Sequence, residues 1–182
     1  MCGRYLFFDE KNEALRDLID AAREKMQKED FEQISLFEVF PGQRAFAIAS
    51  AKEKMKLVPM LWGYQGKSLV INARSETAFS SPFFAGSGRC VIPCSGYYEW
   101  SKQKRKYYFS VDGTAYLGAL YRREADGYHF VILTEDACKP MNTIHPRMPV
   151  LFTKQDAVKW CRNSNEKEML CASLRKRNMT QV

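Results

Sequence analysis

Cys2 is the residue whose position gives it the most distinctive chemistry in this sequence. Initiator methionine is normally removed when the next side chain is small, and its removal would leave Cys2 at the N-terminus. The α-amine and the thiol, which both titrate at neutral to mildly basic pH, would then be two nucleophiles on adjacent carbons. The amine can condense with an aldehyde to an imine, and the thiol can close on that imine to a thiazolidine. The alternative is an incidental second residue.

A second candidate is the string NARSET at residues 72–77. In an extended chain alternate side chains share a face, so we expect Asn72 and Arg74 to point the same way. An amide beside a guanidinium suits a phosphate or another substrate oxygen. Glu76 is expected either to pair with an arginine or to begin a helical turn. The alternative is a polar strand end with a structural ion pair.

The string Tyr97-Tyr98-Glu99-Trp100 offers a carboxyl group among aromatic side chains. Alternation places Tyr97 and Glu99 on one face of a strand, and Tyr98 and Trp100 on the other. Partial desolvation of Glu99 would raise its pKa toward the range that is useful for general acid–base catalysis. The alternative is an exposed glutamate on an edge strand.

His145 is followed by Pro146, Arg147, Met148 and Pro149. Because proline fixes φ, this string predicts a stiffened loop that positions its side chains. A histidine there could move protons near neutral pH. The alternative is a structural histidine.

Taken together and in this order, four strings resemble the SRAP family, the SOS-response-associated peptidase domain, whose members are also called abasic-site processing proteins. The strings are Cys2-Gly3-Arg4, residues 72–77, Tyr98-Glu99-Trp100 and His145-Pro146-Arg147-Met148-Pro149. Supporting matches are Leu61-Trp62-Gly63, residues 89–93 and residues 118–121. The resemblance covers nearly the whole chain.

The resemblance implies a sensor of abasic sites in single-stranded DNA, including junctions of single and double strands. The N-terminal cysteine of such proteins forms a covalent thiazolidine DNA–protein crosslink with the ring-opened sugar, which shields the lesion. Members can also nick abasic DNA by β-elimination through a Schiff base, a lyase activity. The peptidase label reflects proposed self-removal of the N-terminal segment.

The resemblance also implies roles for individual residues. Cys2 is the nucleophile, Asn72 and Arg74 hold the sugar and phosphate, Glu99 is the acid–base residue near the amine, and His145 assists the Schiff-base and ring-opening steps. The expected DNA-binding set is Arg4, Trp62, Arg74 and Arg147. No metal and no cofactor are implied.

The sequence departs from the family pattern in three places. The loop after Trp62-Gly63 is short, covering only residues 64–68. Phe40 stands before Pro41, where the family commonly has asparagine. The chain is also short for the family, mainly at its C-terminus. The short loop puts in doubt any stacking wedge against the opposite DNA strand.

The elements that must position these residues are read from periodicity. Apolar residues at helical spacing predict an amphipathic helix over residues 11–28, and two further helices are expected at 154–162 and 166–174. Short β-like runs are expected at 3–8, 45–49, 55–62, 69–73, 90–93, 97–100, 107–111, 116–121 and 130–134, separated by turns such as Asp112-Gly113. This pattern predicts one α+β domain over residues 1–182, with a strand-rich, barrel-like mixed sheet and peripheral helices.

Composition limits the class of protein and of partner. The chain has 182 residues, 46% of them hydrophobic and 27% charged, which is ordinary for a soluble globular protein. The formal net charge of +7 favours a polyanionic partner, most simply nucleic acid. No apolar run approaches the roughly 20 residues of a membrane span. We expect a monomer without membrane contact, and an intracellular location, the cytoplasm or nucleoid in a bacterium.

The six cysteines have no CxxC pair, and the two histidines lie far downstream of Cys90 and Cys94, so a zinc site is not expected.

The sequence as a whole leaves three hypotheses for the function. The first is a covalent abasic-site sensor. The second is an N-terminal-nucleophile or cysteine hydrolase that uses Cys2, Glu99 and His145. The third is a noncovalent single-strand-binding module in which basic charge and aromatic residues act alone.

Overall fold

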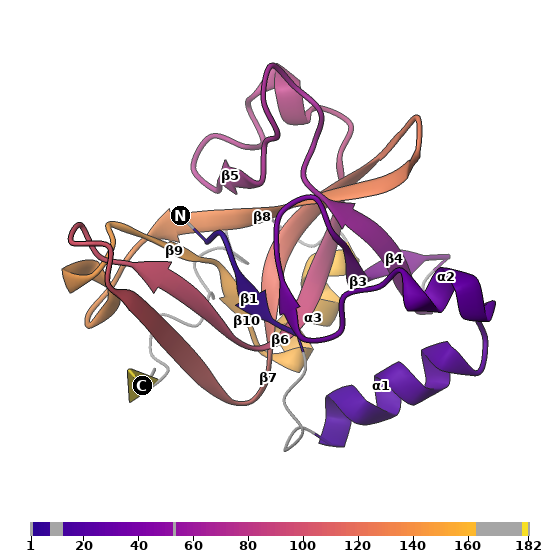
Figure 1. Ribbon diagram of the computed structural model, residues 1–182. Helices are drawn as coiled ribbons and strands as arrows, with labels where there is room; N and C mark the ends of the chain where they lie inside the picture. Colours follow the sequence, from indigo (N-terminus) through magenta and orange to yellow (C-terminus); the bar gives the residue numbers. More distant parts are fainter. Residues whose placement is uncertain (1, 8–12, 53, 163–179, 182) are drawn as a thin grey trace.

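The computed structural model describes residues 2–7, 13–52, 54–162 and 180–181, and its strands join one 11-stranded sheet. Most neighbouring strands are antiparallel, but β8 (Gly127–Asp136) pairs in parallel with β4 (Lys54–Trp62) and β5 (Asn72–Arg74). The described helices α1 (Glu13–Arg23), α2 (Lys28–Glu32) and α3 (Lys154–Cys161) lie outside the strands (Figure 1). The structure therefore confirms a strand-rich α+β fold with a mixed sheet and peripheral helices.

The long central strands are β3 (Arg44–Ala51), β6 (Gly88–Trp100) and β7 (Lys106–Glu124). A pairing between β6 and β7 closes a circuit through β7, β8, β4, β3 and β6. Aromatic side chains fill the interior: Trp62 stacks on Phe130 with ring centroids 6.0 Å apart, and Tyr5 lies 5.3 Å from Trp62. These rings bury large apolar areas, which makes them the main stabilisers of this part of the core.

Short elements complete the description. They are the strands β1 (Tyr5–Leu6), β2 (Glu38–Val39), β9 (Arg147–Pro149), β10 (Leu151–Phe152) and β11 (Thr180–Gln181), and the 3-10 helices η1 (Pro82–Phe84) and η2 (Met141–Thr143). β1 lies between β2 and β6, antiparallel to both. β5 and β9 both pair with the last part of β8, where each has Thr134 as a partner. This order gathers β1, β5, β6 and β9 around the N-terminal segment.

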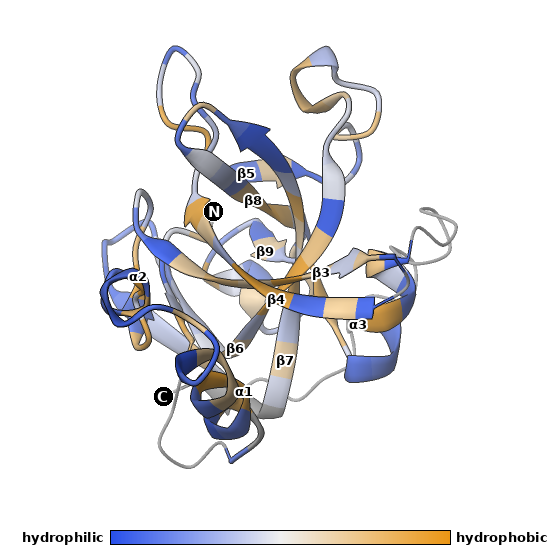
Figure 2. Cartoon of the chain, turned by 90° about the vertical axis from the view of Figure 1, so that its right-hand side faces the viewer, coloured by the Kyte–Doolittle hydropathy of each residue, from blue (hydrophilic) through white to orange (hydrophobic). Residues whose placement is uncertain are grey.

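The helix expected over 11–28 is wrong in its extent. α1 ends at Arg23, and the separate helix α2 begins at Lys28. The break lets Phe31 turn inward, where its ring lies 6.1 Å from that of Phe46. In Figure 2 hydrophilic and hydrophobic residues are interspersed along α1, as the spacing predicts. Among the described residues, no helix has the length and hydropathy needed to cross a membrane.

Several expected strands are longer in the structure than in the sequence analysis. The runs at 90–93 and 97–100 are one strand, β6, and those at 107–111 and 116–121 are one strand, β7. The Asp112-Gly113 signal does not end β7. Instead the register of the β6–β7 pair shifts there. Cys94 pairs with Ala115, whereas Gly96 pairs with Ser110. The run at 69–73 is represented by the shorter β5, and the helix expected at 166–174 lies outside the described residues.

Candidate functional site

Cys2 is held at one end of β1 by contacts with two other strands. Tyr5 faces Tyr97 across the β1–β6 ladder, and the backbone N–H of Tyr98 donates to the carbonyl oxygen of Arg4 at 2.9 Å. The Cys2 side chain is completely buried. Asn72 on β5 donates from Nδ2 to the carbonyl oxygen of Cys2 at 2.9 Å. The position of Cys2 is thus set by a residue 70 positions away.

Glu99 is an almost fully buried carboxyl group, with 2% of its surface exposed. Tyr97 is buried beside it, while Tyr98 and Trp100 are less buried, so the alternation expected for this string is confirmed. Burial raises the pKa of the Glu99 carboxyl, and the nearby His145 partly opposes that shift.

The Cys2 thiol belongs to the same electrostatic environment. Burial is the main cause that raises its pKa well above the usual value for cysteine, and the charge of Glu99 raises it further. The thiol of the free protein is therefore protonated near neutral pH. A base must remove its proton before or during any attack by sulfur.

His145 sits in a loop that is fixed at several points. Nδ1 of His145 lies 2.9 Å from the carbonyl oxygen of Arg147, to which it can donate, and 3.0 Å from the backbone N–H of Arg147, from which it can accept. The tautomer of the ring decides which of these two bonds forms. The backbone N–H of His145 donates to the carbonyl of Met141 at 3.0 Å, and that of Ala137 donates to the carbonyl of Pro146 at 2.9 Å. These bonds agree with the stiffened loop that the prolines predict.

Cys2, Asn72, Glu99 and His145 are therefore neighbours, although they come from the N-terminal segment, β5, β6 and the loop before β9. They combine one buried thiol, one amide and two proton-transfer groups. Such a set can hold a small electrophile beside a nucleophile and move protons to and from it.

Arg147 and Arg74 differ in what their guanidinium groups contact. Arg147 donates to both carboxylate oxygens of Glu76 at 2.8 Å and also pairs with Asp136. Glu76 thus pairs with an arginine, one of the two expectations for it. A DNA phosphate would have to compete with two carboxylates for Arg147. Arg74 is exposed, and no hydrogen bond or ion pair to another described residue holds its side chain.

The comparisons with known proteins decide the family. The family model described as SOS response associated peptidase (SRAP) matches residues 1–182. The chain belongs to the SRAP family. It is 28% identical over 181 residues to the abasic site processing protein YedK of Escherichia coli (strain K12), covering 89% of this chain and 80% of that protein. It is also 28% identical over 188 residues to the abasic site processing protein YobE of Bacillus subtilis (strain 168), covering 91% and 84%.

A solved structure supports the fold of this SRAP chain. The crystal structure of a phage-related protein from Bordetella bronchiseptica superposes with a TM-score of 0.74 at 24% identity. The match covers 100% of this chain and 93% of the other. At this identity the likeness concerns the fold alone.

Arg4 of the SRAP chain, two residues after Cys2, lies over the rings of aromatic side chains. Its guanidinium carbon is 4.3 Å from the ring centroid of Phe40 and 5.2 Å from that of Trp100, and Nη1 is 3.3 Å from Glu38. The sequence analysis named Phe40 only as a departure from the family pattern and did not name Glu38, because both reach Arg4 only through the pairing of β1 with β2. Cations interleaved with aromatic rings are typical of surfaces that bind single strands.

Trp62 does not fit its expected role as a DNA contact. Its side chain is completely buried, stacked on Phe130, and its Nε1 donates to the carbonyl of Ile71 at 2.9 Å. The buried rings of Phe130 and Tyr5 already pack against the Trp62 ring, so the structure assigns Trp62 to the core of the SRAP fold. The remaining role assignments stay predictions.

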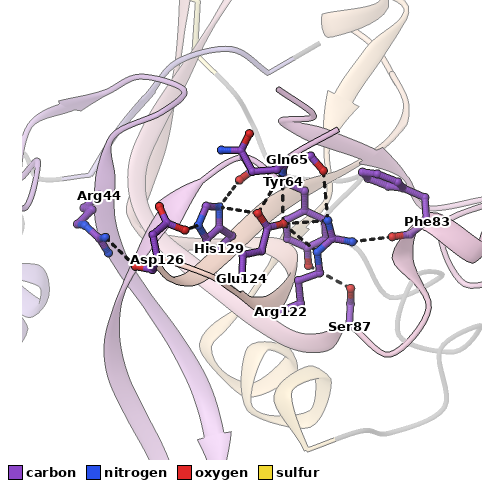
Figure 3. A network of polar contacts seen from close by, with 10 residues as sticks. Arg44, Tyr64, Gln65, Phe83, Ser87, Arg122, Glu124, Asp126 and His129 are labelled. Carbon is purple, nitrogen blue, oxygen red and sulfur yellow. Dashed lines mark hydrogen bonds and ion pairs between the residues drawn. The ribbon is translucent and has the colours of Figure 1, made fainter. Parts of the chain in front are cut away.

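A second polar network, which the sequence analysis missed, surrounds the β7–β8 turn (Figure 3). His129 is completely buried, with Nδ1 donating to the carbonyl of Gly63 at 2.7 Å and Nε2 bonded to Asp126 at 2.6 Å. Glu124 accepts from the backbone N–H of Gln65, and Arg122 donates to the carbonyl of Phe83 at 2.8 Å.

This network therefore clamps the loops at 63–70 and 81–87, which precede and follow β5 in the chain. Charged residues at a hairpin turn are common in any sequence, so no pattern indicates that these four meet two distant loops. Because the loops flank Asn72 and Arg74, the network contributes to placing β5 beside Cys2.

Proposed function

We propose that this SRAP protein captures abasic sites in single-stranded DNA, including junctions with duplex, as a covalent thiazolidine on Cys2. The observation that carries the proposal is the placement of Cys2 by Asn72 beside Glu99 and His145. The names of the two relatives, both abasic site processing proteins, support the same lesion as the substrate. The proposal requires one protein copy per lesion and intracellular DNA as the partner.

The chemistry needs two bond-forming steps and no redox change. After removal of Met1, the α-amine of Cys2 attacks the aldehyde carbon of the ring-opened sugar, and loss of one water gives an imine. The sulfur of Cys2 then bonds to the imine carbon, and the thiol proton ends on the nitrogen. The product is a thiazolidine, formed with the net loss of one water.

Glu99 and His145 are the groups proposed to move protons in these steps. Condensation needs a proton for the departing water, and thiol addition needs a base for the sulfur. The raised pKa of the Glu99 carboxyl brings its protonated form closer to neutral pH, so that it can serve as donor and then acceptor. Asn72, through its bond to the Cys2 carbonyl, keeps the nucleophile in position.

The imine also allows a second outcome, which we include in the proposal. Loss of a proton next to the imine carbon expels the 3′ phosphate by β-elimination and nicks the strand, a lyase activity. Closure by the thiol removes the imine and competes with this reaction. The self-removal of an N-terminal segment that the family label suggests would use the same Cys2.

The test mixes purified protein with a single-stranded oligonucleotide that carries one abasic site. We expect a heat-stable adduct on a denaturing gel, with the mass of protein lacking Met1 plus DNA minus one water. Cys2→Ala should abolish the adduct, and Cys2→Ser should leave an imine that borohydride traps. Cys161→Ala, in α3 and away from the site, serves as the control.

Three results would contradict the proposal. An adduct of Cys2→Ala equal to that of the native protein would remove the assigned nucleophile. Peptide cleavage without an adduct would indicate an N-terminal-nucleophile hydrolase instead. Salt-labile binding alone would indicate a noncovalent module.

A further inference from the structure

The turn between β6 and β7 carries three exposed cations that the site above does not use: Lys102, Lys104 and Arg105. β6 ends at Trp100 and β7 begins at Lys106, and these two residues face each other across the ladder. Within the described part of the chain, no hydrogen bond or ion pair engages the side chains of the three turn residues. Among the described residues, none therefore neutralises these three positive charges at this end of the sheet.

The backbone of this turn is well defined. The N–H of Lys104 donates to the carbonyl of Ser101 at 2.9 Å, and the N–H of Ser101 donates to the carbonyl of Arg105 at 3.0 Å. The hydroxyl of Ser101 accepts from the N–H of Arg105 at 3.3 Å. Lys104 has a φ of 61°, in the left-handed region. A fixed turn presents its three cations together, on a single protruding tip.

The tip is continuous with the candidate site. Lys106 lies 4.0 Å above the ring of Tyr98, and Arg4 lies over Trp100. Glu38 pairs with both Arg4 and Lys106, at 3.3 and 3.5 Å, so one carboxylate is shared by two cations. Figure 1 shows the β6–β7 turn on the same side of the molecule as the N-terminus and β9. Positive charge therefore extends from beside Cys2 to the tip.

The spacing places the tip beyond Glu99 and the candidate site. The turn residues follow Glu99 by three to six positions, and a strand advances about 3.3 Å per residue, so the tip lies roughly 10 Å further along. That reach suits DNA next to the abasic sugar rather than the sugar itself. Lysine and arginine side chains bind phosphates without reading the bases, as flanking DNA of any sequence requires.

We propose that Lys102, Lys104 and Arg105 form a second contact for the phosphate backbone of the single strand that flanks the lesion. The proposal rests on the proposed function for the direction in which the strand leaves Cys2. It extends the proposed DNA footprint from the candidate site to the β6–β7 turn.

The test compares two basic turns of the same chain. The variant K102Q/K104N/R105Q removes the charges of the β6–β7 turn, and K52N/K54Q/K56Q removes three exposed lysines around the β3–β4 turn. Lys52 has a φ of 49° and so matches Lys104, and asparagine tolerates this conformation at both positions. Because Ala49 pairs with Cys90 near the start of β6, the control turn lies at the other end of that strand from Trp100.

Affinity for undamaged single-stranded DNA is measured by fluorescence anisotropy over a series of salt concentrations. With an oligonucleotide of about 16 nucleotides, the K102Q/K104N/R105Q variant should lower the slope of log affinity against log salt by about 2, or about 0.7 for each of three phosphates. Thermal melting verifies that both variants fold.

If the K102Q/K104N/R105Q variant binds this oligonucleotide with the same slope of log affinity against log salt as the native protein, the proposal is overturned. If the K52N/K54Q/K56Q control loses as much slope, the proposal is overturned as well. The effect would then depend on the net charge of the protein and not on where the charges lie. As a second variant, K102E/R105E should lower the affinity further than the neutral changes do, and an affinity equal to theirs would contradict a phosphate contact.

Undamaged DNA keeps this test separate from the covalent chemistry. If the native protein forms no adduct with abasic DNA and the β6–β7 variant still loses slope, the proposed function fails and the contact stands. If the adduct forms and the slope is unchanged, the proposed function stands and the contact fails.

Discussion

At the residue scale, Glu99 is a carboxyl group that the fold removes from water. Its carboxyl is buried on the inner face of β6, where desolvation raises its pKa and the nearby His145 only partly opposes the shift. A residue with a shifted pKa in such a position is a common mark of a functional site. It also carries a cost in stability, because the native state holds the charged form unfavourably.

The variant Glu99→Gln should therefore be more stable than the native protein at neutral pH. The native pKa lies above the unfolded one, so the folded state binds the extra proton, and its stability falls as pH rises between the two values. Glutamine does not titrate, so the advantage of the variant should grow across that window and level off above it. Chemical denaturation from about pH 4 to pH 8 measures this, and a constant difference would contradict it.

The same variant should lose rate rather than affinity. A general acid–base residue contributes typically about 10²–10⁴-fold, so we expect Glu99→Gln to slow crosslinking at least tenfold, and His145→Gln to act similarly. Binding of an uncleavable abasic analogue should change little. Single-turnover time courses over a range of pH test both. If both variants crosslink at the native rate but bind the analogue more weakly, Glu99 and His145 only position the substrate.

Arg74 and Arg147, which the sequence suggests as equivalent phosphate contacts, should behave differently. Arg74→Gln removes an exposed charge that no hydrogen bond or ion pair to another described residue holds, and it should lower the salt slope for a single strand by about 0.7. Arg147→Gln breaks charged hydrogen bonds to Glu76 and should instead cost about 1–3 kcal/mol of folding stability. Salt titrations and urea unfolding of both variants separate the two roles. If Arg74→Gln is destabilised and keeps the salt slope of the native protein, Arg74 stabilises the fold and is not a phosphate contact.

At the element scale, the sequence predicts strands well and their ends poorly. Alternating apolar residues locate β3, β4, β6, β7 and β8, because half-buried strands need that period. The breaks expected near Ser95-Gly96 and Asp112-Gly113 are absent, because a long antiparallel pair absorbs extra residues as an irregularity in register. Local turn signals cannot distinguish such an irregularity from a true turn.

Gly96 is the residue that makes this irregularity possible. A Cβ there would lie 2.5 Å from the carbonyl oxygen of Phe109, a backbone atom that cannot move aside without shifting β7. Gly96→Ala should therefore destabilise the fold by about 1–3 kcal/mol. Gly86→Asn is the matched control, since nothing lies within 4 Å of a Cβ at Gly86 and asparagine tolerates its φ of 74°. If the two variants have equal unfolding midpoints, β7 can shift to make room for the added Cβ without a loss of stability.

Elements also explain why the site was only partly predictable. Cys2, Asn72, Glu99 and His145 were identified from strings that resemble a family, and the strand pairings bring them together. Trp62 was misassigned because burial follows from which face of β4 packs on Phe130, a fact of the assembled sheet. The ion pair of Arg147 was only partly predicted. Pairing with an arginine was one of two expectations for Glu76, but which arginine it meets depends on the pairing of β8 with β9.

At the scale of the whole molecule, charge and chemistry are separated in space. The net charge of +7 is carried largely by exposed side chains, whereas Cys2 and Glu99 are buried. Exposed charges are screened by salt, while buried pairs are screened much less. Capture of DNA and the covalent reaction should therefore respond differently to ionic strength.

Single-turnover crosslinking over a range of DNA concentrations, at two salt concentrations, measures both responses. For about four phosphate contacts on a single strand, a fourfold rise in salt should weaken the apparent affinity by about 50-fold. The rate at saturating DNA should stay within about twofold, because the proton transfers proposed for Glu99 and His145 would occur in a site that bulk salt screens weakly. An oligonucleotide of scrambled sequence around the same lesion should give the same pair of values, since phosphate contacts carry no sequence information. If the saturating rate fell as steeply as the affinity, exposed cations would act on the chemical step, and the division between a charged capture surface and a buried reaction site would be wrong.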